Sequence, residues 1–140
     1  MKKIKSTFLA ALVVLCFFAL PTAVATETEP RASEQITTYA TGVYPAGNGE
    51  LAIEFSISSR GIMSKIGAKE IKIYHGNRWV FCDTYTQNDD GMCTTNDYAY
   101  DNTIVYSGTA GTYYKVVVTV FAENGSGSDS RTETHYVTAK

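Results

Sequence analysis

Apolar and polar residues alternate with a period of two over most of the chain beyond residue 35. In the clearest stretch Leu51, Ile53, Phe55 and Ile57 are separated by polar or small residues. This alternation predicts a strand with one buried face, because successive side chains of a strand point to opposite sides. The predicted strands span residues 36–44, 50–57, 68–75, 78–86, 98–107, 112–122 and 132–138.

Segments rich in glycine and asparagine separate these strands, as expected for turns. No segment shows a convincing apolar stripe of helical period, although residues 59–66 leave room for one short helical turn. Seven strands between residues 36 and 140 predict an all-β protein, a single antiparallel β-sandwich of the immunoglobulin or fibronectin type III-like kind.

A glycine turn followed by two tyrosines begins the most apolar of the predicted strands. Val116, Val118 and Val120 continue the face of Tyr114, so Tyr114 is the candidate for a tyrosine corner, the buried tyrosine that such sandwiches place at the start of one strand. Tyr113 is the fallback. The other interpretation is that both tyrosines simply begin a buried strand.

The first 25 residues have the three parts of a secretory signal peptide. Lys2, Lys3 and Lys5 precede an apolar run over residues 8–20, and a small-residue exit ends at Ala25. The run is too short to span a bilayer stably. We therefore expect cleavage after Ala25 and a secreted, extracellular product.

A lipoprotein is the competing interpretation, in which Cys16 would be acylated and retained. Leu15 stands where the processing enzyme needs a small residue, so we expect Cys16 to be removed with the signal peptide and no membrane anchor to remain. Residues 26–35 are polar and without periodicity, which predicts a disordered leader. The β-sandwich domain then covers residues 36–140.

Charge narrows the range of partners. Removal of the three lysines of the signal peptide leaves nine of the 12 Lys and Arg residues against 14 Asp and Glu residues, a formal charge of −5. Nucleic acids and anionic membranes both need a basic surface, so neither is an expected partner.

Several short motifs are distributed along the mature chain. They are YPAGNG at 44–49, Met63 with IGA at 66–68, IKIY at 71–74, GM at 91–92, YSG at 106–108, GTYYK at 111–115 and GSDSR at 127–131. In this combination the chain resembles a family of small secreted proteins of Gram-positive, largely gut-associated bacteria, known only as a domain of unknown function. The resemblance implies secretion and a small β domain, and it supplies no activity. Cys82 and Cys93 depart from the family pattern.

Those two cysteines remain after the signal peptide is removed. An even number of cysteines in an oxidising compartment predicts a disulfide between Cys82 and Cys93, with free thiols as the alternative. Their spacing suits neither a closed zinc site nor a redox pair.

An acidic segment, residues 83–101, lies in a part of the chain without lysine or arginine. Asp89, Asp90 and Asp97 are spaced faintly like the ligands of a calcium loop, but Thr86 stands where the first aspartate should be. Aspartates that form turns explain the same residues. Both interpretations stay open, and no cofactor is expected.

Nothing in the sequence forms a catalytic motif. His75 and His135 are the only residues suited to act as bases at neutral pH, and neither lies in a nucleophile motif. Glu50 and Glu54 share a strand face at roughly 13 Å, too far apart for a glycosidase pair. We do not expect an enzyme.

The tyrosine content is the compositional anomaly of the sequence. All ten tyrosines lie in the mature chain. The alternation places Trp79, Phe81 and Tyr85 on one face of a strand, and Tyr98 and Tyr100 on one face of the next. Exposed aromatic rings form platforms for sugars or proteins, whereas cross-strand aromatic pairs also stabilise sheets without a ligand.

Two functions follow from these features. The preferred one is a secreted, non-catalytic protein that binds an extracellular glycan or protein through its aromatic residues. The alternative is a structural or matrix protein, or a secreted effector such as an inhibitor or antimicrobial factor. An exposed aromatic strip favours the first, and a rigid protruding loop at residues 87–97 favours the second.

Overall fold

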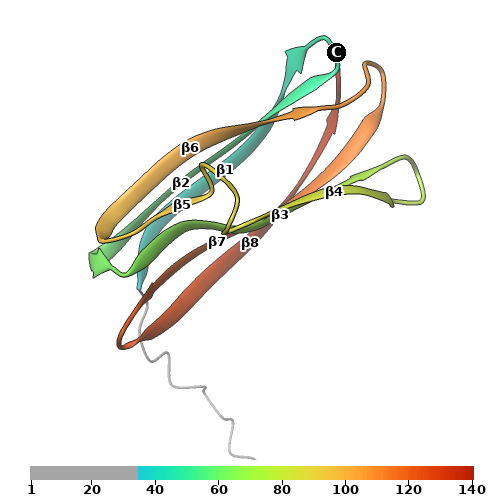
Figure 1. Cartoon of the computed structure of the whole chain (residues 1–140). Coiled ribbons are helices and arrows are strands. Elements are labelled where there is room, and N and C mark those ends of the chain that lie inside the picture. Colours follow the sequence, from blue (N-terminus) through green and yellow to red (C-terminus); the bar gives the residue numbers. More distant parts are fainter. Residues whose placement is uncertain (1–34) are drawn as a thin grey trace, which may run out of the picture. The chain divides into compact units, whose positions relative to one another are not determined.

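Eight strands in two layers make up residues 35–140, the part of the chain that the computed structural model describes (Figure 1). The predicted signal peptide, residues 1–25, and the predicted leader up to residue 34 lie outside the described residues. The strands are β1 (Ile36–Gly47), β2 (Glu50–Met63), β3 (Lys65–His75), β4 (Val80–Thr86), β5 (Cys93–Thr94), β6 (Asp97–Ser107), β7 (Tyr113–Asn124) and β8 (Gly127–Thr138).

One layer is a three-stranded sheet in the order β1-β2-β6, and the other is a five-stranded sheet in the order β4-β3-β7-β8, with β5 paired to β3. Every strand pair is antiparallel. The predicted all-β, two-sheet antiparallel architecture is thus confirmed, with eight strands in place of about seven. The additional strand is β5, whose two residues are too few for a recognisable alternation.

The short helical turn expected over residues 59–66 is wrong. β2 continues to Met63, and β3 begins at Lys65 after the single residue Ser64. Met63 is 1% exposed and Ile66 is fully buried, so the chain passes from one sheet to the other while both side chains stay in the core. Within residues 35–140 there is no helix, and hence none long and apolar enough to cross a membrane.

The core lies between the two sheets and is built by the alternating positions of their strands. Leu51, Ile53, Phe55 and Ile57 of β2 are at most 2% exposed, and they meet an equally buried row on β3 and β7. Burial of apolar side chains in this way is the main favourable term in folding, worth about 25 cal/mol per Å². The facing row consists of Ile66, Ala68, Ile71, Ile73, Val116, Val118 and Val120.

Tyr114 lies at the start of β7 and is 3% exposed. Its hydroxyl accepts a hydrogen bond from the backbone N–H of Thr109, at 2.9 Å, in the loop before the strand. Its ring meets Tyr106 edge to face at 5.8 Å between ring centres. The buried ring thereby fixes the 108–112 loop to the sandwich.

The other end of the sandwich depends on one glycine. Gly67 of β3 has a φ of 149°, and a Cβ at this position would lie 2.4 Å from the carbonyl oxygen of Met92. This close approach lets β5 pair with β3, where Cys93 lies opposite Gly67. The residue before β5 is anchored in the core as well, because the side chain of Met92 is fully buried.

Polar side chains join the edge strand of one sheet to the edge strand of the other. On β1, the N–H of Ile36 donates to a carboxylate oxygen of Asp129 on β8, at 3.4 Å. Gln35 exchanges amide hydrogen bonds with Asn124, at 3.2 and 3.4 Å, and is 6% exposed. The last residue of the predicted leader is therefore part of the sandwich.

Candidate functional site

A β-bulge in β4 decides which aromatic side chains of that strand face outward. Asp83 lies opposite Ile73, and Phe81 lies opposite Tyr74, which leaves Cys82 as the extra residue. Directly opposed residues of an antiparallel pair share a face, so Phe81 lies on the outer face of the five-stranded sheet beside Tyr74. The two rings meet edge to face at 5.8 Å.

The same row continues across the whole sheet. Tyr74 lies opposite Lys115 on β7, and Lys115 lies opposite Tyr136 on β8. One line over four adjacent strands is therefore formed by Phe81, Tyr74, Lys115 and Tyr136. Phe81 and Tyr136 are each 55% exposed, so the two ends of the line are open to solvent.

Trp79 completes this surface from the turn between β3 and β4. It has a φ of 51°, a left-handed conformation uncommon for a large residue, and immediately precedes β4. Its ring lies 5.6 Å from that of Tyr113 and 5.4 Å from that of Tyr136. Tyr113 and Tyr136 are stacked at 6.3 Å with an interplanar angle of 19°.

Lys115 lies among these rings as the only charged member of the row. Its Nζ is 4.9 Å from the ring centre of Tyr74 and 5.4 Å from that of Trp79. Both contacts are within the range of cation–π attraction. We call this surface the aromatic platform, and it consists of Tyr74, Trp79, Phe81, Tyr113 and Tyr136 around Lys115.

The structure places the predicted binding residues in different parts of the molecule. Trp79 and Phe81 belong to the aromatic platform. Tyr85 lies opposite Ile71 and packs against the core, because the bulge reverses the alternation between Phe81 and Tyr85.

The two predicted aromatic residues of β6 lie on the other sheet. Tyr98 is 63% exposed near the beginning of the strand. Tyr100 packs against the core with its ring 6.0 Å from that of Phe55, and its hydroxyl donates to the carbonyl oxygen of Gly91 at 3.0 Å. Neither belongs to the aromatic platform.

Sequence reasoning missed Tyr74, Tyr113, Tyr136 and Lys115. A signal for two of them was present, because an inward Tyr114 and Val116 require Tyr113 and Lys115 to point outward. The cross-strand register, which brings Tyr74 and Tyr136 to the same row, is not encoded in any one strand.

The predicted Cys82–Cys93 disulfide is absent, and both cysteines are free. Cys82 lies at the bulge beside Ile73, whereas Cys93 lies opposite Gly67. These two positions on β3 are six residues apart, or roughly 20 Å at about 3.3 Å per residue. A disulfide requires Cα atoms within roughly 7 Å, so the register of β3 rules out this pairing.

Burial raises the pKa of both thiols above the ordinary value of 9.0. Near Cys82, a hydrogen bond with Tyr106 opposes this pKa increase and the charge of Asp83 adds to it. The Sγ of Cys93 donates to the carbonyl oxygen of Gln87 at 3.1 Å. Both groups therefore stay protonated at neutral pH and are poor nucleophiles.

The acidic segment uses its carboxylates for local turns. One carboxylate oxygen of Asp89 accepts hydrogen bonds from the N–H and the hydroxyl of Thr86, at 2.6 and 3.1 Å. Asp97 accepts from the N–H of Tyr98 at 2.8 Å. No group of three metal-ligating side chains gathers among residues 35–140.

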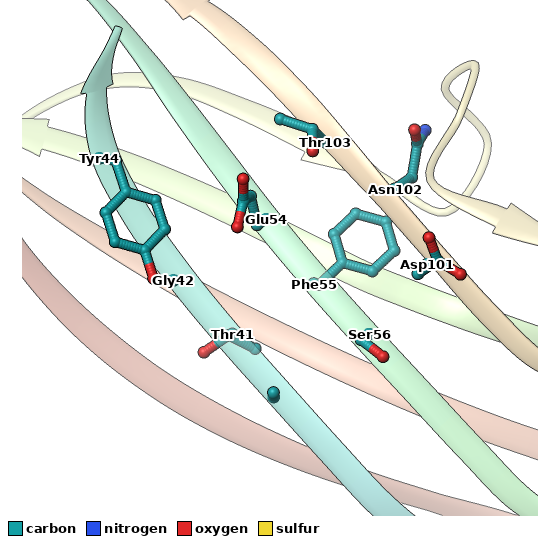
Figure 2. Close-up of a pocket in the computed structure, with 10 residues that line it drawn as sticks. Thr41, Gly42, Tyr44, Glu54, Phe55, Ser56, Asp101, Asn102 and Thr103 are labelled. Atoms are coloured by element: carbon teal, nitrogen blue, oxygen red, sulfur yellow. The ribbon is translucent and has the colours of Figure 1, made fainter.

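A trough of about 540 Å³ crosses the outer face of the three-stranded sheet (Figure 2). The ring of Tyr44 lies over Gly42, where a Cβ would be only 2.6 Å from the tyrosine hydroxyl. Glu54 of β2 and Asp101 of β6 also line the trough. Its two carboxylates disfavour an anionic ligand, so this trough and the aromatic platform differ in charge.

His135 of β8 links the two sheets through a hydrogen bond with Thr41 of β1. The Nε2 of His135 is 2.6 Å from the hydroxyl of Thr41 and 3.8 Å from a carboxylate oxygen of Glu133. A catalytic triad needs its acid on the other ring nitrogen, whereas Glu133 and Thr41 here approach the same one. The arrangement fits a link between β1 and β8 better than a general base.

No protein-family model, curated protein or solved structure matches the chain. The resemblance to a secreted Gram-positive family therefore stays a prediction.

Proposed function

We propose that this protein is a secreted, non-catalytic β-sandwich that binds an extracellular glycan through the aromatic platform. The observation that carries the proposal is the convergence of five aromatic residues on one outer sheet face. A soluble domain gains little by leaving rings such as Phe81 and Tyr136 each 55% exposed in one row. Flat aromatic faces suit the C–H faces of sugar rings, and tyrosine hydroxyls suit their hydroxyl groups.

The platform is also rigid, which favours binding. Its members contact one another at ring-centre distances of 5.4 to 6.3 Å. Four of the five stand on hydrogen-bonded strands, and Trp79 stands in the short turn between β3 and β4. A preorganised surface loses less conformational freedom when a ligand binds.

A fibronectin type III-like fold is part of the proposal. Two observations support it, namely the strand order β1-β2-β6 in one sheet with β4-β3-β7-β8 in the other, and the buried Tyr114 at the start of β7. Export rests on the composition of residues 1–25, and N-terminal sequencing of the secreted protein should find Thr26 first.

An effector that acts through a protruding acidic loop is less well supported. The carbonyl oxygen of Gly91 accepts hydrogen bonds from Tyr100 and, at 2.7 Å, from the Asn102 amide of β6. β5 pairs with β3 on the other side of the same segment. The segment is thus fixed between the two sheets.

A panel of immobilised polysaccharides tests the proposal with two platform variants. We expect Tyr136→Ala and Phe81→Ala each to weaken binding by about fivefold or more, because each stacked ring contributes about 1 kcal/mol or more. Tyr98→Ala is the matched control, since Tyr98 is 63% exposed on the other sheet. It should bind like the wild type.

Circular dichroism and thermal unfolding show whether the variants keep the fold. Equal loss of binding in all three variants would contradict a role for the platform. Binding to a purified extracellular protein, with no binding to any polysaccharide, would replace the glycan by a protein partner.

A further inference from the structure

The charge around the aromatic platform is opposite to that of the whole domain. The platform residues lie in the segments 74–81, 113–117 and 134–138, which contain Arg78 and Lys115 and no aspartate or glutamate. The full mature chain is strongly acidic. Positively charged side chains therefore coincide with the exposed rings.

Lys115 is the basic residue at the centre of this surface. Among residues 35–140 it has no carboxylate within ion-pair distance, whereas Lys72 pairs with Glu70 at 3.3 Å. The rings of Tyr74 and Trp79 contact its ammonium through their faces, and within residues 35–140 its Nζ donates no hydrogen bond. An ammonium carries three donors, so Lys115 keeps its hydrogen-bonding capacity for a ligand.

The position of Lys115 makes a neutral ligand unfavourable. A sugar stacked on Tyr136 and Trp79 would cover the ammonium and remove water from it, and burial of an uncompensated charge is costly. An anionic group on the ligand would compensate the charge and form a charge-assisted hydrogen bond. Arg78, in the turn beside Trp79, adds a second positive charge at the same end of the sheet.

We propose that the ligand of the aromatic platform is an acidic glycan, whose carboxylate or sulfate binds Lys115 while the adjoining sugar rings stack on Tyr136 and Trp79. This inference rests on the proposed function, because it names the class of glycan for the same surface. It predicts that the protein distinguishes charged from neutral forms of one polymer.

Matched pairs of polymers test the inference directly. The probes are polygalacturonate with its methyl ester, hyaluronan with its carboxyl-reduced form, and heparin with its desulfated, carboxyl-reduced form. We expect at least tenfold tighter binding to the charged member of at least one pair, and we expect added salt to weaken this binding. Lys115→Gln should remove the preference, and Lys115→Arg should keep most of it.

Lys72→Gln is the control for net charge, because it removes one positive charge from the same outer face outside the row. It should leave the preference intact, and thermal unfolding of each variant checks the fold. Equal binding to charged and neutral members, or an unchanged preference in Lys115→Gln, overturns the inference. If the inference fails in this way but Tyr136→Ala still weakens binding to the polysaccharide, the proposed function stands. If no polysaccharide binds at all, both fail.

Discussion

Tyr74 on β3 and Lys115 on β7 lie directly opposite each other, and the Lys115 ammonium is 4.9 Å from the centre of the tyrosine ring. Trp79 contacts the same ammonium from the turn before β4. Cation–π contacts of this kind are worth about 0.5 to 2 kcal/mol each. They hold a long, flexible side chain in one place on the sheet, so the charge of the platform is positioned before a ligand arrives.

Tyr114→Phe should destabilise the protein by about 1 to 2 kcal/mol, because it leaves the N–H of Thr109 without its partner. Urea unfolding measures the loss. Tyr113→Phe is the matched control, since Tyr113 is 42% exposed, and it should change stability by less than about 0.5 kcal/mol. Equal unfolding midpoints for Tyr114→Phe and the wild type would show that the hydroxyl does not fix the 108–112 loop.

Gly67→Ala should be more destabilising, by about 2 kcal/mol or more, because it adds a clash with the Met92 carbonyl to a strained φ. Gly125→Ala is the control, since an added Cβ there meets nothing within 4 Å. Thermal unfolding of the two variants should separate them clearly. A Gly67→Ala protein as stable as Gly125→Ala would mean that β5 does not pair closely with β3.

Both cysteines should be free thiols in protein purified without reductant. The mass of the non-reduced protein should equal that of the reduced one, and a reductant should not shift the unfolding temperature. Because burial raises the pKa of Cys82 and Cys93, alkylation should be slower than that of a cysteine in a short peptide at pH 8, and should accelerate as the pH rises. A non-reduced mass lower by two hydrogens would contradict the register that separates these residues.

Tyr106 should ionise at a higher pH than an ordinary tyrosine. Burial, with smaller effects from Cys82, Tyr114 and Asp83, raises its pKa to about 12. A raised pKa in the folded state means that the stabilising effect of the neutral phenol is complete below about pH 10 and is lost as the pH approaches 12. Ultraviolet titration should show a late phase that Tyr106→Phe removes. A single phase at the ordinary pKa would refute this environment.

Much of the architecture is readable from the sequence because it depends on local alternation. Leu51 to Ile57 repeat with period two, and both their strand and their buried face follow from that repeat. β5 was not predictable, since two residues carry no period and pair with β3 only because Gly67 lets the chain approach. The end of β2 at Met63 likewise depends on packing between the sheets.

The candidate site was less accessible to sequence reasoning because it is a property of register. One extra residue, Cys82, puts Phe81 and Tyr85 on opposite faces, and the pairing of β4 and β5 along β3 keeps Cys82 apart from Cys93. A one-residue shift in a strand exchanges its two faces, and the sequence of a single strand contains no mark of such a shift. The alternation alone predicts Trp79 and Phe81 as binding residues on one strand face, whereas the row that joins Phe81 to Tyr136 exists only in the folded sheet.

The central claim, that the aromatic platform is a binding surface, is tested most directly by the fluorescence of Trp79. Trp79 is the single tryptophan of the chain, so its emission reports on this surface alone. Titration with a polysaccharide that binds in the immobilised panel should change the emission in a saturable way, with the same affinity as in the panel. Saturating binding that leaves the emission of Trp79 unchanged would place the ligand elsewhere and contradict the account.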